Sequence, residues 1–462
     1  MIEIATRRNQ TLAVFGLGGS GLAAARALAA SGARVAAWDD NESSRRGAAS
    51  AGLALVDLYA ADWRAFDGLV LAPGVPYTHK PHAVIRLAQE AGCPVLGDVE
   101  LLVEACAGAS FIGITGTNGK STTTALIGHI LQSAGRDVRV GGNLGPPALG
   151  FAPPAKDTVF VLELSSYQLD LTERATFDIA VLINISPDHL DRHGDMQGYV
   201  AAKTRIFRDR PGGGQTAVVG VDDEHGREIV RTLAGRPGWS VIPIAVGRAL
   251  DRGVFALDGA LFDATDGPAK RVATLTGIPT LLGTHNWQNA AAAWAAAKTA
   301  GVAPAQIAAG IASYPGLPHR IETVATIDGV LYVNDSKATN ADATIRALAC
   351  FDSIYWIAGG LPKESGLAGV EPYLPRVRRA FLIGKAEADF ARFLDGRVPV
   401  SRCGDLKTAL AEAHALAQKE KIVGAAVLLS PACASFDQWK NFEARGDGFR
   451  DMVRALAREE SP

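Results

Sequence analysis

The clearest chemical signal in this sequence is a glycine-rich turn that ends in a lysine and hydroxyl residues. It follows the apolar stretch 111–114, precedes a helical stretch, and reads Thr115-Gly116-Thr117-Asn118-Gly119-Lys120-Ser121-Thr122. Backbone N–H groups at a helix start, aided by the helix dipole, hold phosphate oxygens. Lys120 would offset β- and γ-phosphate charge, and the Ser121 hydroxyl could bind Mg²⁺. Because Gly113 and Gly119 enclose five residues where a Walker A loop has four, the turn predicts a phosphate loop but no generic nucleoside triphosphatase.

Charged side chains also end two further apolar runs. Glu163 follows the run 159–162, where it could bind Mg²⁺ or cap the next turn. His189 follows the run 179–185, where it could lie at the edge of a phosphate or Mg²⁺ site or belong to a surface loop. Parallel strands place ligands at their carboxyl ends, so both residues are candidates for one site. His193 is four residues from His189, but no third residue has the spacing of a zinc ligand.

Lys203 has a position that could change its chemistry. In the helical stretch 198–207 it shares a face with Val200, Thr204 and Phe207. Burial of that face would lower the pKa of the lysine, because burial disfavours the charged form. A neutral amine can react with CO₂ to give a carbamate, which would be an anionic metal ligand. The alternative is an ordinary lysine that extends its amine to solvent.

A second glycine-rich turn lies near the N-terminus. It follows the predicted strand 12–15 and reads Gly16-Leu17-Gly18-Gly19-Ser20-Gly21, and Asp39 and Asp40 follow the next strand, 34–38. Such a turn favours a diphosphate at the helix start and an acid on a ribose hydroxyl. A dinucleotide and a UDP-sugar make the same demands, and a tight turn without any ligand would also fit. The strand-ending loop Pro73-Gly74 could line the same crevice.

The last third of the chain has three more strand-ending loops with cations or hydroxyls. Lys337 and Thr339 follow the strand 331–333, Lys363 follows 354–357, and Ser435 follows 425–429. Together they could bind a dicarboxylate, although each alone could be a cap or a surface charge. Before this region, Asn286 and Asn289 lie three residues apart at the start of an alanine-rich helix, where they could contact a nucleotide or cap the helix.

These residues need elements that hold them in place. The chain alternates short apolar runs, Gly- or Asn-rich turns and Ala/Leu-rich helical stretches, which is typical of parallel sheets covered by helices. A chain of 462 residues is also too long for one hydrophobic core. We therefore expect an α/β protein of three domains: a Rossmann-like domain at 1–97, a central P-loop-like ATP-binding domain with a parallel sheet at 98–316, and a Rossmann-like domain at 317–462.

Composition narrows the class of protein. A net charge of −2 gives no basic surface for nucleic acid or an anionic membrane. The five cysteines are scattered without a CxxC pair, which suits a reducing compartment. The N-terminus lacks the apolar core of a signal peptide, and the apolar runs are too short to span a bilayer. We expect a cytoplasmic monomer that does not insert into membranes.

Four segments of the chain resemble the Mur ligases. They are the phosphate loop 116–122, the His-Asn-x-x-Asn run 285–289, the run 334–340, and the stretch 429–446, which resembles the D-glutamate-adding members of that family. The resemblance covers essentially the whole chain. It implies an ATP-dependent, ADP-forming acid–amino-acid ligase of peptidoglycan precursor synthesis, which joins D-glutamate to UDP-N-acetylmuramoyl-L-alanine through an acyl phosphate. The alternatives are a ligase for another acceptor amino acid and, in a different class, an NAD-dependent oxidoreductase that relies on the first glycine turn.

The resemblance also implies a role for individual residues. Catalysis would involve Lys120, Glu163, His189 and Lys203, with Lys203 carbamylated; two Mg²⁺ ions would contact Ser121, Glu163, Lys203 and His189. ATP would contact Gly116, Thr117, Asn118, Gly119, Lys120, Ser121, Thr122, Asn286, Asn289, Arg320 and Asp335. The UDP substrate would contact Gly19, Ser20, Asp39, Asp40, Pro73, Gly74 and Asn143, and D-glutamate would contact Lys337, Thr339, Lys363, Ser435 and Phe442. The chain departs from the family at Leu361-Pro362, where an Asp and a Gly usually precede the lysine.

Overall fold

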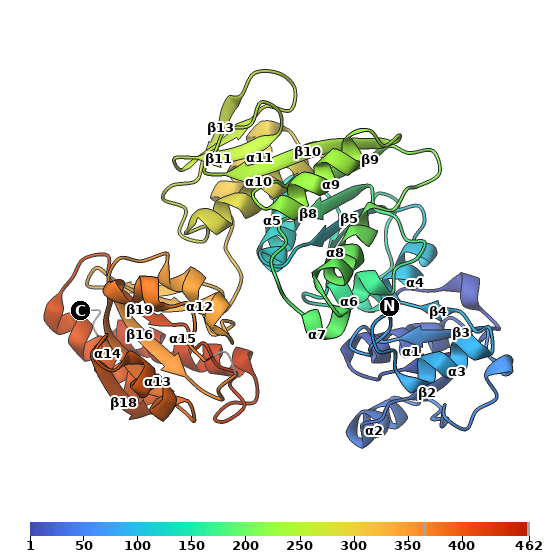
Figure 1. Cartoon of the computed structure of the whole chain (residues 1–462), viewed down its shortest axis with the longest axis horizontal. Coiled ribbons are helices and arrows are strands. Elements are labelled where there is room, and N and C mark those ends of the chain that lie inside the picture. The colour runs from blue at the N-terminus through green and yellow to red at the C-terminus, as the bar shows by residue number, and fades with distance from the viewer. Residues whose placement is uncertain (364–365, 460–462) are drawn as a thin grey trace. The chain divides into compact units, whose positions relative to one another are not determined.

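The computed structural model describes residues 1–363 and 366–459, and its chain forms two compact units (Figure 1). The first unit comprises Met1–Leu275 and Asn286–Tyr314, and the second comprises Thr276–His285 and Pro315–Pro462. The described residues form three sheets, two in the first unit and one in the second, so the expected α/β class is confirmed. The proposed boundaries at residues 97 and 316 stay predictions. Among the described residues, no helix combines the length and the apolar character that crossing a membrane requires.

The N-terminal sheet is four-stranded and parallel, in the order β2-β1-β3-β4. Its strands are β1 (Thr11–Phe15), β2 (Arg34–Trp38), β3 (Gly68–Leu71) and β4 (Val95–Leu96), and the helices of this part are η1 (Ala5–Arg7), α1 (Gly19–Ala30), α2 (Glu42–Ser50), η2 (Trp63–Ala65), α3 (Ala83–Glu90) and α4 (Asp98–Ala105). The glycine turn between β1 and α1 is tight. Gly16 has φ 87°, and a Cβ on Gly21 would lie 1.7 Å from the Gly16 carbonyl oxygen, so both positions need glycine.

The second sheet has nine strands in the order β13-β12-β11-β10-β9-β8-β5-β7-β6. They are β5 (Ser110–Thr115), β6 (Val138–Gly142), β7 (Val159–Glu163), β8 (Ile179–Leu182), β9 (Gln215–Gly220), β10 (Trp239–Val246), β11 (Val254–Leu257), β12 (Ala260–Asp263) and β13 (Lys270–Thr274). In the order of the sheet, the neighbouring strands from β6 through β7, β5, β8, β9 and β10 to β11 pair in parallel. The pairs β11–β12 and β12–β13 are antiparallel. The expected parallel sheet is therefore present, and short turns after β11 and β12 reverse the chain and add two antiparallel strands at this edge.

Helices surround this sheet, and its core continues into the first sheet. The helical elements are α5 (Lys120–Ser133), η3 (Ala148–Gly150), α6 (Ser166–Asp170), α7 (Leu190–His193), α8 (Met196–Thr204), η4 (Arg205–Phe207), α9 (Glu224–Ala234), α10 (Thr284–Thr299) and α11 (Pro304–Ala312). One buried cluster includes Leu12 of β1, Leu28 of α1 and Phe160 of β7. The rings of Phe111 and Phe160 stack within it, 5.1 Å apart. This shared core makes the first two sheets one compact unit.

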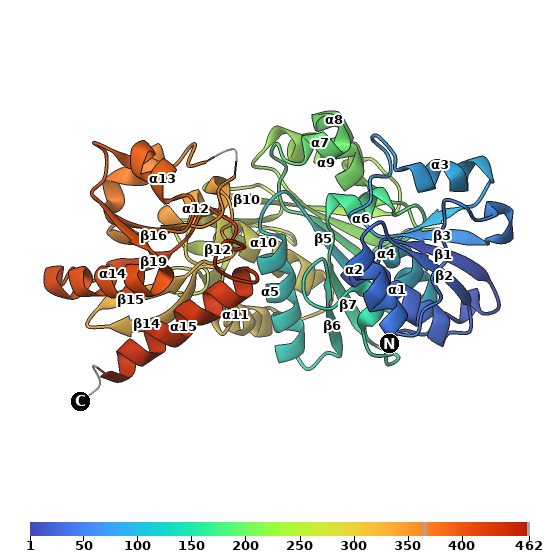
Figure 2. The same cartoon turned by 90° about the horizontal axis from the view of Figure 1, so that it is seen from below.

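The third sheet has six strands in the order β14-β15-β19-β16-β17-β18, with β14 and β15 antiparallel and the rest parallel. The strands are β14 (Glu322–Ile327), β15 (Val330–Asn334), β16 (Ile354–Gly359), β17 (Val377–Ile383), β18 (Val400–Gly404) and β19 (Ala426–Leu429); the helices are α12 (Ala341–Leu348), η5 (Glu371–Arg376), α13 (Glu387–Leu394), α14 (Leu406–Glu420) and α15 (Phe442–Glu459). Along β16, Tyr355 and Ile357 enter one buried cluster while Trp356 and Ala358 enter another. The sheet is therefore buried on both faces, and α15 packs along β14 and β15 (Figure 2).

Candidate active site

The turn between β5 and α5 has the backbone of a phosphate-binding loop. Gly119 caps the N-terminus of α5 with a left-handed φ of 83°, and a Cβ there would lie 2.2 Å from Asn289 Oδ1. Lys120 Nζ donates hydrogen bonds to the carbonyl oxygens of Gly116 (2.9 Å) and Thr117 (2.8 Å). The amine is thus held over the loop at the start of the helix, where an anionic group would meet both the lysine and the N–H groups of the first helical turn.

The loop is supported by residues that the sequence did not single out. The Asn118 N–H donates to Asn184 Oδ1 (2.9 Å), and the Asn184 amide donates to Gln288 Oε1 on α10 (2.9 Å). The Thr117 hydroxyl lies 3.1 Å from the Ser186 carbonyl oxygen and 3.1 Å from the Tyr199 hydroxyl. Asn184 and Ser186 follow β8, so the rule that ligand-site residues follow strand ends could have found them.

The asparagine pair on α10 lies against the first turn of α5. Asn289 is 2% exposed; its Oδ1 accepts from the Thr123 hydroxyl (3.2 Å), and its Nδ2 donates to Asn286 Oδ1 (3.0 Å). Because α10 begins at Thr284, both asparagines lie within the helix and not at the position before it. Their position supports the phosphate loop, and their contact with a nucleotide stays a prediction.

Lys203 lies beneath the same loop and is 1% exposed. Its Nζ donates to the Gly116 carbonyl oxygen (2.7 Å) and lies 4.6 Å from the centre of the Tyr199 ring. The alternative of a solvent-extended lysine is therefore wrong. Burial, and then the nearby positive charge of Lys120, lowers the pKa of Lys203 well below its ordinary value. The lowered pKa increases the fraction of the neutral, nucleophilic form of this amine beside the phosphate loop.

Glu163 has a carboxylate oxygen next to the loop that no described residue hydrogen-bonds. It ends β7, directly opposite Ile114 of β5, and is 3% exposed. Its Oε1 accepts from Asn143 Nδ2 (2.7 Å), whereas Oε2 is buried without a hydrogen-bond partner among the described residues. Buried polar atoms are nearly always paired, and a carboxylate oxygen with this geometry fits a hard cation such as Mg²⁺. The described residues contain no cluster of three or more His, Cys, Asp or Glu side chains that could hold a metal alone, so water or phosphate oxygens would complete the coordination.

The two histidines after β8 have different surroundings. His189 has φ 52° and a side chain about half exposed, and its Nδ1 lies 3.0 Å from the Tyr167 hydroxyl. His193 is buried, its Nε2 lies 3.0 Å from the Ser166 hydroxyl, and burial lowers its pKa. They therefore contact different hydroxyl groups, and this arrangement gives no support to the zinc alternative.

In the N-terminal glycine turn, Asp39, which is predicted to bind the UDP substrate, stabilises the turn itself. Asp39 Oδ2 accepts the Leu17 N–H (2.5 Å), so this carboxylate holds the turn, while Asp40 accepts from the Tyr59 hydroxyl (2.8 Å). Gly19 and Ser20 open α1, as expected. The Pro73 carbonyl oxygen accepts from Arg192 Nη2 (3.2 Å). Arg192 belongs to α7, so it fastens the Pro73-Gly74 loop to the segment that contains His189; its sequence context gave no hint of this.

In the second unit, the three predicted acceptor loops end neighbouring strands. β15, β19 and β16 lie side by side and parallel, so the loops with Lys337, Ser435 and Lys363 share one edge of the sheet. Lys337 Nζ lies 3.9 Å from the centre of the Phe442 ring, and Leu361 N–H donates to the Ala434 carbonyl oxygen (2.8 Å). The Leu361-Pro362 segment, which precedes Lys363, is therefore hydrogen-bonded to the loop that contains Ser435.

Two further side chains fix these loops from inside. Asp335 accepts from the Ser430 hydroxyl (2.8 Å) and the Ile321 N–H (3.2 Å), and burial raises its pKa to about 7. Arg445, 1% exposed, donates to the carbonyl oxygens of Ser336 (2.9 Å) and Cys433 (3.1 Å), and burial lowers its pKa to about 10. Arg445 therefore joins the loops after β15 and β19, a role that the sequence did not reveal.

The fold and the site resemble those of the Mur ligases. The family model described as the Mur ligase middle domain matches residues 114–297, which include the phosphate loop, Lys203 and both α10 asparagines. The solved structure of UDP-N-acetylmuramate-alanine ligase MurC from Thermotoga maritima has the same fold, with a TM-score of 0.58 at 15% identity over 97% of this chain and 100% of that one. A pseudomurein peptide ligase type C from Methanothermus fervidus gives 0.56 at 17% identity, again over 97% and 100% of the two chains.

Full-length relatives narrow the class further. The UDP-N-acetylmuramoylalanine--D-glutamate ligase of Caulobacter sp. (strain K31) is 51% identical over 99% of both chains. The enzyme of that name from Rhodospirillum rubrum is 52% identical over 99% of this chain and 97% of its own length. This chain belongs to the UDP-N-acetylmuramoylalanine--D-glutamate ligase family.

Proposed function

We propose that this protein is the ATP-dependent ligase that adds D-glutamate to UDP-N-acetylmuramoyl-L-alanine in peptidoglycan precursor synthesis. The observation that carries the proposal is full-length identity of about one half to enzymes so named. The phosphate loop also supports the proposal, because a buried lysine and a carboxylate oxygen that no described residue hydrogen-bonds lie beside it. A location in the cytoplasm and a monomeric state stay predictions.

The reaction has to make an unreactive carboxylate electrophilic. Transfer of the γ-phosphoryl group of ATP to the carboxylate of the L-alanine residue gives an acyl phosphate and ADP. The uncharged amine of D-glutamate then attacks the acyl carbon, the new C–N bond forms, the amine loses a proton, and inorganic phosphate leaves. Lys120, held at the start of α5, would offset the negative charge that develops on the transferred group.

The metal-binding part of the site would be built by residues around the phosphate loop. Glu163 Oε2 and the Ser121 hydroxyl would be protein ligands of Mg²⁺, with His189 at the edge of the site. Bound Mg²⁺ would neutralise phosphate charge. Lys203 would join this group after attack of its neutral amine on CO₂, with one proton released and an anionic carbamate formed. The low pKa of Lys203 supports that step, because the unprotonated amine is the reactive form.

The substrates would bind at the strand ends of the other two sheets. The UDP group would lie at the N-terminal glycine turn, near Gly19, Ser20 and Asp40. Because Asp39 is engaged with the Leu17 N–H, its share in binding would be to keep the turn closed around the diphosphate. D-Glutamate would be held by the three loops of the C-terminal sheet, with Lys337 and Lys363 facing its carboxylates and Thr339, Ser435 and Phe442 beside them.

The test is ADP release with UDP-N-acetylmuramoyl-L-alanine and a single amino acid at a time. We expect turnover with D-glutamate and at least about 100-fold less with L-glutamate, L-alanine or diaminopimelate, because a polar site rejects a ligand that leaves its groups unpaired. Turnover with a different amino acid would reassign the acceptor. Amino-acid-independent oxidation of NADH would instead favour the oxidoreductase alternative.

A further inference from the structure

A segment with unusual backbone geometry surrounds Arg320, the arginine predicted to contact ATP. His319 has φ 63° and Ile321 has φ 44°, both in the left-handed region. Residues with side chains seldom adopt this region, and for a β-branched residue such as Ile321 it is a marked outlier. Such a backbone persists where its surroundings over-determine it, so the contacts of this segment call for a functional explanation.

Contacts from three directions hold the segment. The His319 N–H donates to Glu322 Oε2 (2.8 Å), and the Ile321 N–H donates to Asp335 Oδ1 (3.2 Å). His319 is 6% exposed, and its Nδ1 lies 3.0 Å from Asn334 Nδ2. On the side of α15, a Cβ on Gly446 would lie 2.2 Å from His319 Nδ1, so the helix packs against the ring without room for another atom.

The segment also reaches the acceptor loop. The His319 carbonyl oxygen accepts a hydrogen bond from the Lys337 N–H (3.0 Å). Lys337 is the cation predicted to bind D-glutamate, and its Nζ lies against the Phe442 ring. One short stretch of backbone therefore fixes both a predicted nucleotide ligand, Arg320, and a predicted acceptor ligand, Lys337.

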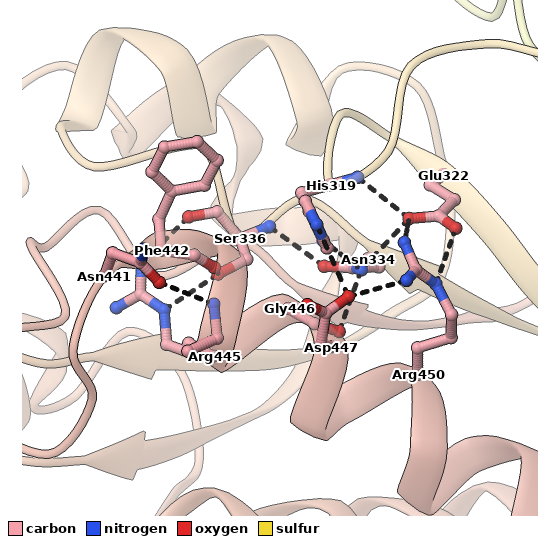
Figure 3. Close-up of polar contacts among 11 residues, drawn as sticks. His319, Glu322, Asn334, Ser336, Asn441, Phe442, Arg445, Gly446, Asp447 and Arg450 are labelled. Atoms are coloured by element: carbon pink, nitrogen blue, oxygen red, sulfur yellow. Dashed lines mark hydrogen bonds and ion pairs between the residues drawn. The ribbon is translucent and has the colours of Figure 1, made fainter. Parts of the chain in front are cut away.

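A two-pronged ion pair clamps this stretch to α15. Arg450 donates from Nε to Glu322 Oε1 (3.0 Å) and from Nη2 to Glu322 Oε2 (3.1 Å), and its Nη1 donates to Asp447 Oδ1 (2.6 Å) (Figure 3). The side chains of Arg450 and Glu322 are 18% and 23% exposed. Glu322 Oε2 accepts from Asn334 Nδ2 (3.1 Å) as well as from His319 and Arg450. Two parallel charge-assisted hydrogen bonds fix geometry as well as adding stability.

We propose that the Glu322–Arg450 pair is a positioning device for the ligase site, which holds the left-handed segment around Arg320 and, through it, the Lys337 loop. Neither residue touches substrate in this role; both act through His319. The inference rests on the proposed function, because that function supplies the ligands of Arg320 and Lys337. The competing explanation is that the pair fastens α15 to β14 and does nothing more.

Kinetics of Arg450 variants separate these explanations. Arg450→Met removes the charge and the fork while keeping an unbranched side chain, and Arg450→Lys keeps the charge without the fork. Arg378→Met is the matched control, because Arg378 pairs with Glu420 (3.2 Å) in the same unit and away from the segment. We expect Arg450→Met to raise the KM values for ATP and D-glutamate about tenfold, Arg450→Lys to recover part of that loss, and the control to stay within about twofold of the parent protein.

Amide hydrogen exchange gives a readout that does not depend on turnover. In Arg450→Met, exchange in residues 317–340 should become about tenfold faster, while α14 (Leu406–Glu420) stays as protected as in the parent protein. If Arg450→Met melts earlier but keeps the KM values of the parent protein and the parent's slow exchange in residues 317–340, the positioning role is overturned. If the parent protein releases no ADP with D-glutamate, the proposed function fails, and unchanged exchange in residues 317–340 would then reject the clamp separately.

Discussion

Replacing Gly119 with alanine tests how closely the phosphate loop is packed. Gly119 has φ 83°, and a Cβ there would lie 2.2 Å from Asn289 Oδ1. Gly135, just beyond the other end of α5, has φ 79° with nothing within 4 Å of its Cβ position. Alanine at either site incurs the left-handed backbone cost of about 1–2 kcal/mol. The two variants therefore differ mainly in what the new methyl group meets.

The size of that difference follows from the contacts of Asn289. This side chain is 2% exposed, accepts from the Thr123 hydroxyl and donates to Asn286 Oδ1. Displacing it breaks both hydrogen bonds, each worth about 0.5–1.5 kcal/mol. Gly119→Ala should therefore lower the free energy of unfolding by about 1–3 kcal/mol more than Gly135→Ala does. The same displacement distorts the loop that would bind the phosphates, so a loss of about 1–3 kcal/mol in binding should lower affinity for an ATP analogue about 5- to 150-fold, since about 1.4 kcal/mol is a factor of ten in an equilibrium constant.

Urea unfolding measures the first quantity, and titration calorimetry with a non-hydrolysable ATP analogue and Mg²⁺ measures the second. The double variant Gly119→Ala/Asn289→Ala removes the obstructing amide and should be about as stable as Gly119→Ala alone, because that variant has already lost both hydrogen bonds of Asn289. Equal unfolding free energies and equal analogue affinities for the Gly119 and Gly135 variants would refute the reasoning, because the clash between the new methyl group and Asn289 would then have no energetic effect.

Three further predictions concern single side chains. Glu163→Gln should fold normally, since a glutamine oxygen can still accept from Asn143. At a Mg²⁺ concentration that saturates the parent protein, its ADP release should fall on the order of 100-fold. An unchanged rate together with an unchanged Mg²⁺ requirement would contradict a ligand role. Lys203→Met should abolish turnover and remove one source of the pH dependence of folding stability. The pKa of Lys203 is well below 10.5 in the folded chain, so the unfolded chain binds one more proton than the folded chain does. The parent protein therefore gains stability as the pH rises toward 10.5. Urea titrations across alkaline pH would show a flatter profile for the variant, and an unchanged profile would count against the low pKa. Asp263→Asn should lower the free energy of unfolding at neutral pH by about 1–3 kcal/mol. Burial alone would raise the pKa of Asp263, but hydrogen bonds from Lys298, Thr265 and Trp294 bring it to about 2. The contribution of Asp263 to stability is therefore fully present above pH 3.8 and is lost as the pH falls through about 2. Acid unfolding of the variant should accordingly begin from a lower plateau, with less pH dependence in that window.

Local backbone rules predicted the parts of this molecule that depend on neighbouring residues in the chain. Gly16 and Gly119 mark strand-to-helix turns because their left-handed backbone and close contacts exclude larger residues. The strand ends at Glu163 and Asn334 follow from apolar runs that stop at a polar residue. These rules predicted the class of the fold and the strand-to-helix turn of the phosphate loop.

Contacts between distant segments could not be predicted in the same way. Asn289 lies inside α10 and acts on α5, and its neighbours in the sequence say nothing of Thr123. Arg192 and Arg445 look like surface cations in sequence, yet each lies buried and donates to carbonyl oxygens of a distant loop. The antiparallel strands β12 and β13 were missed because short strand pairs carry little signal beyond their turns.

The carbonyl oxygen of Gly116 accepts hydrogen bonds from two lysines, Lys120 at 2.9 Å and Lys203 at 2.7 Å. The two proposed processes would therefore meet at one atom: anion binding would act on Lys120, and CO₂ addition would act on Lys203. Thermodynamic linkage makes their influence mutual, so whatever factor a bound nucleotide applies to carbamate formation, carbamate formation applies to nucleotide affinity. The dissolved CO₂ concentration would then belong among the conditions that set the apparent affinity of this ligase for ATP.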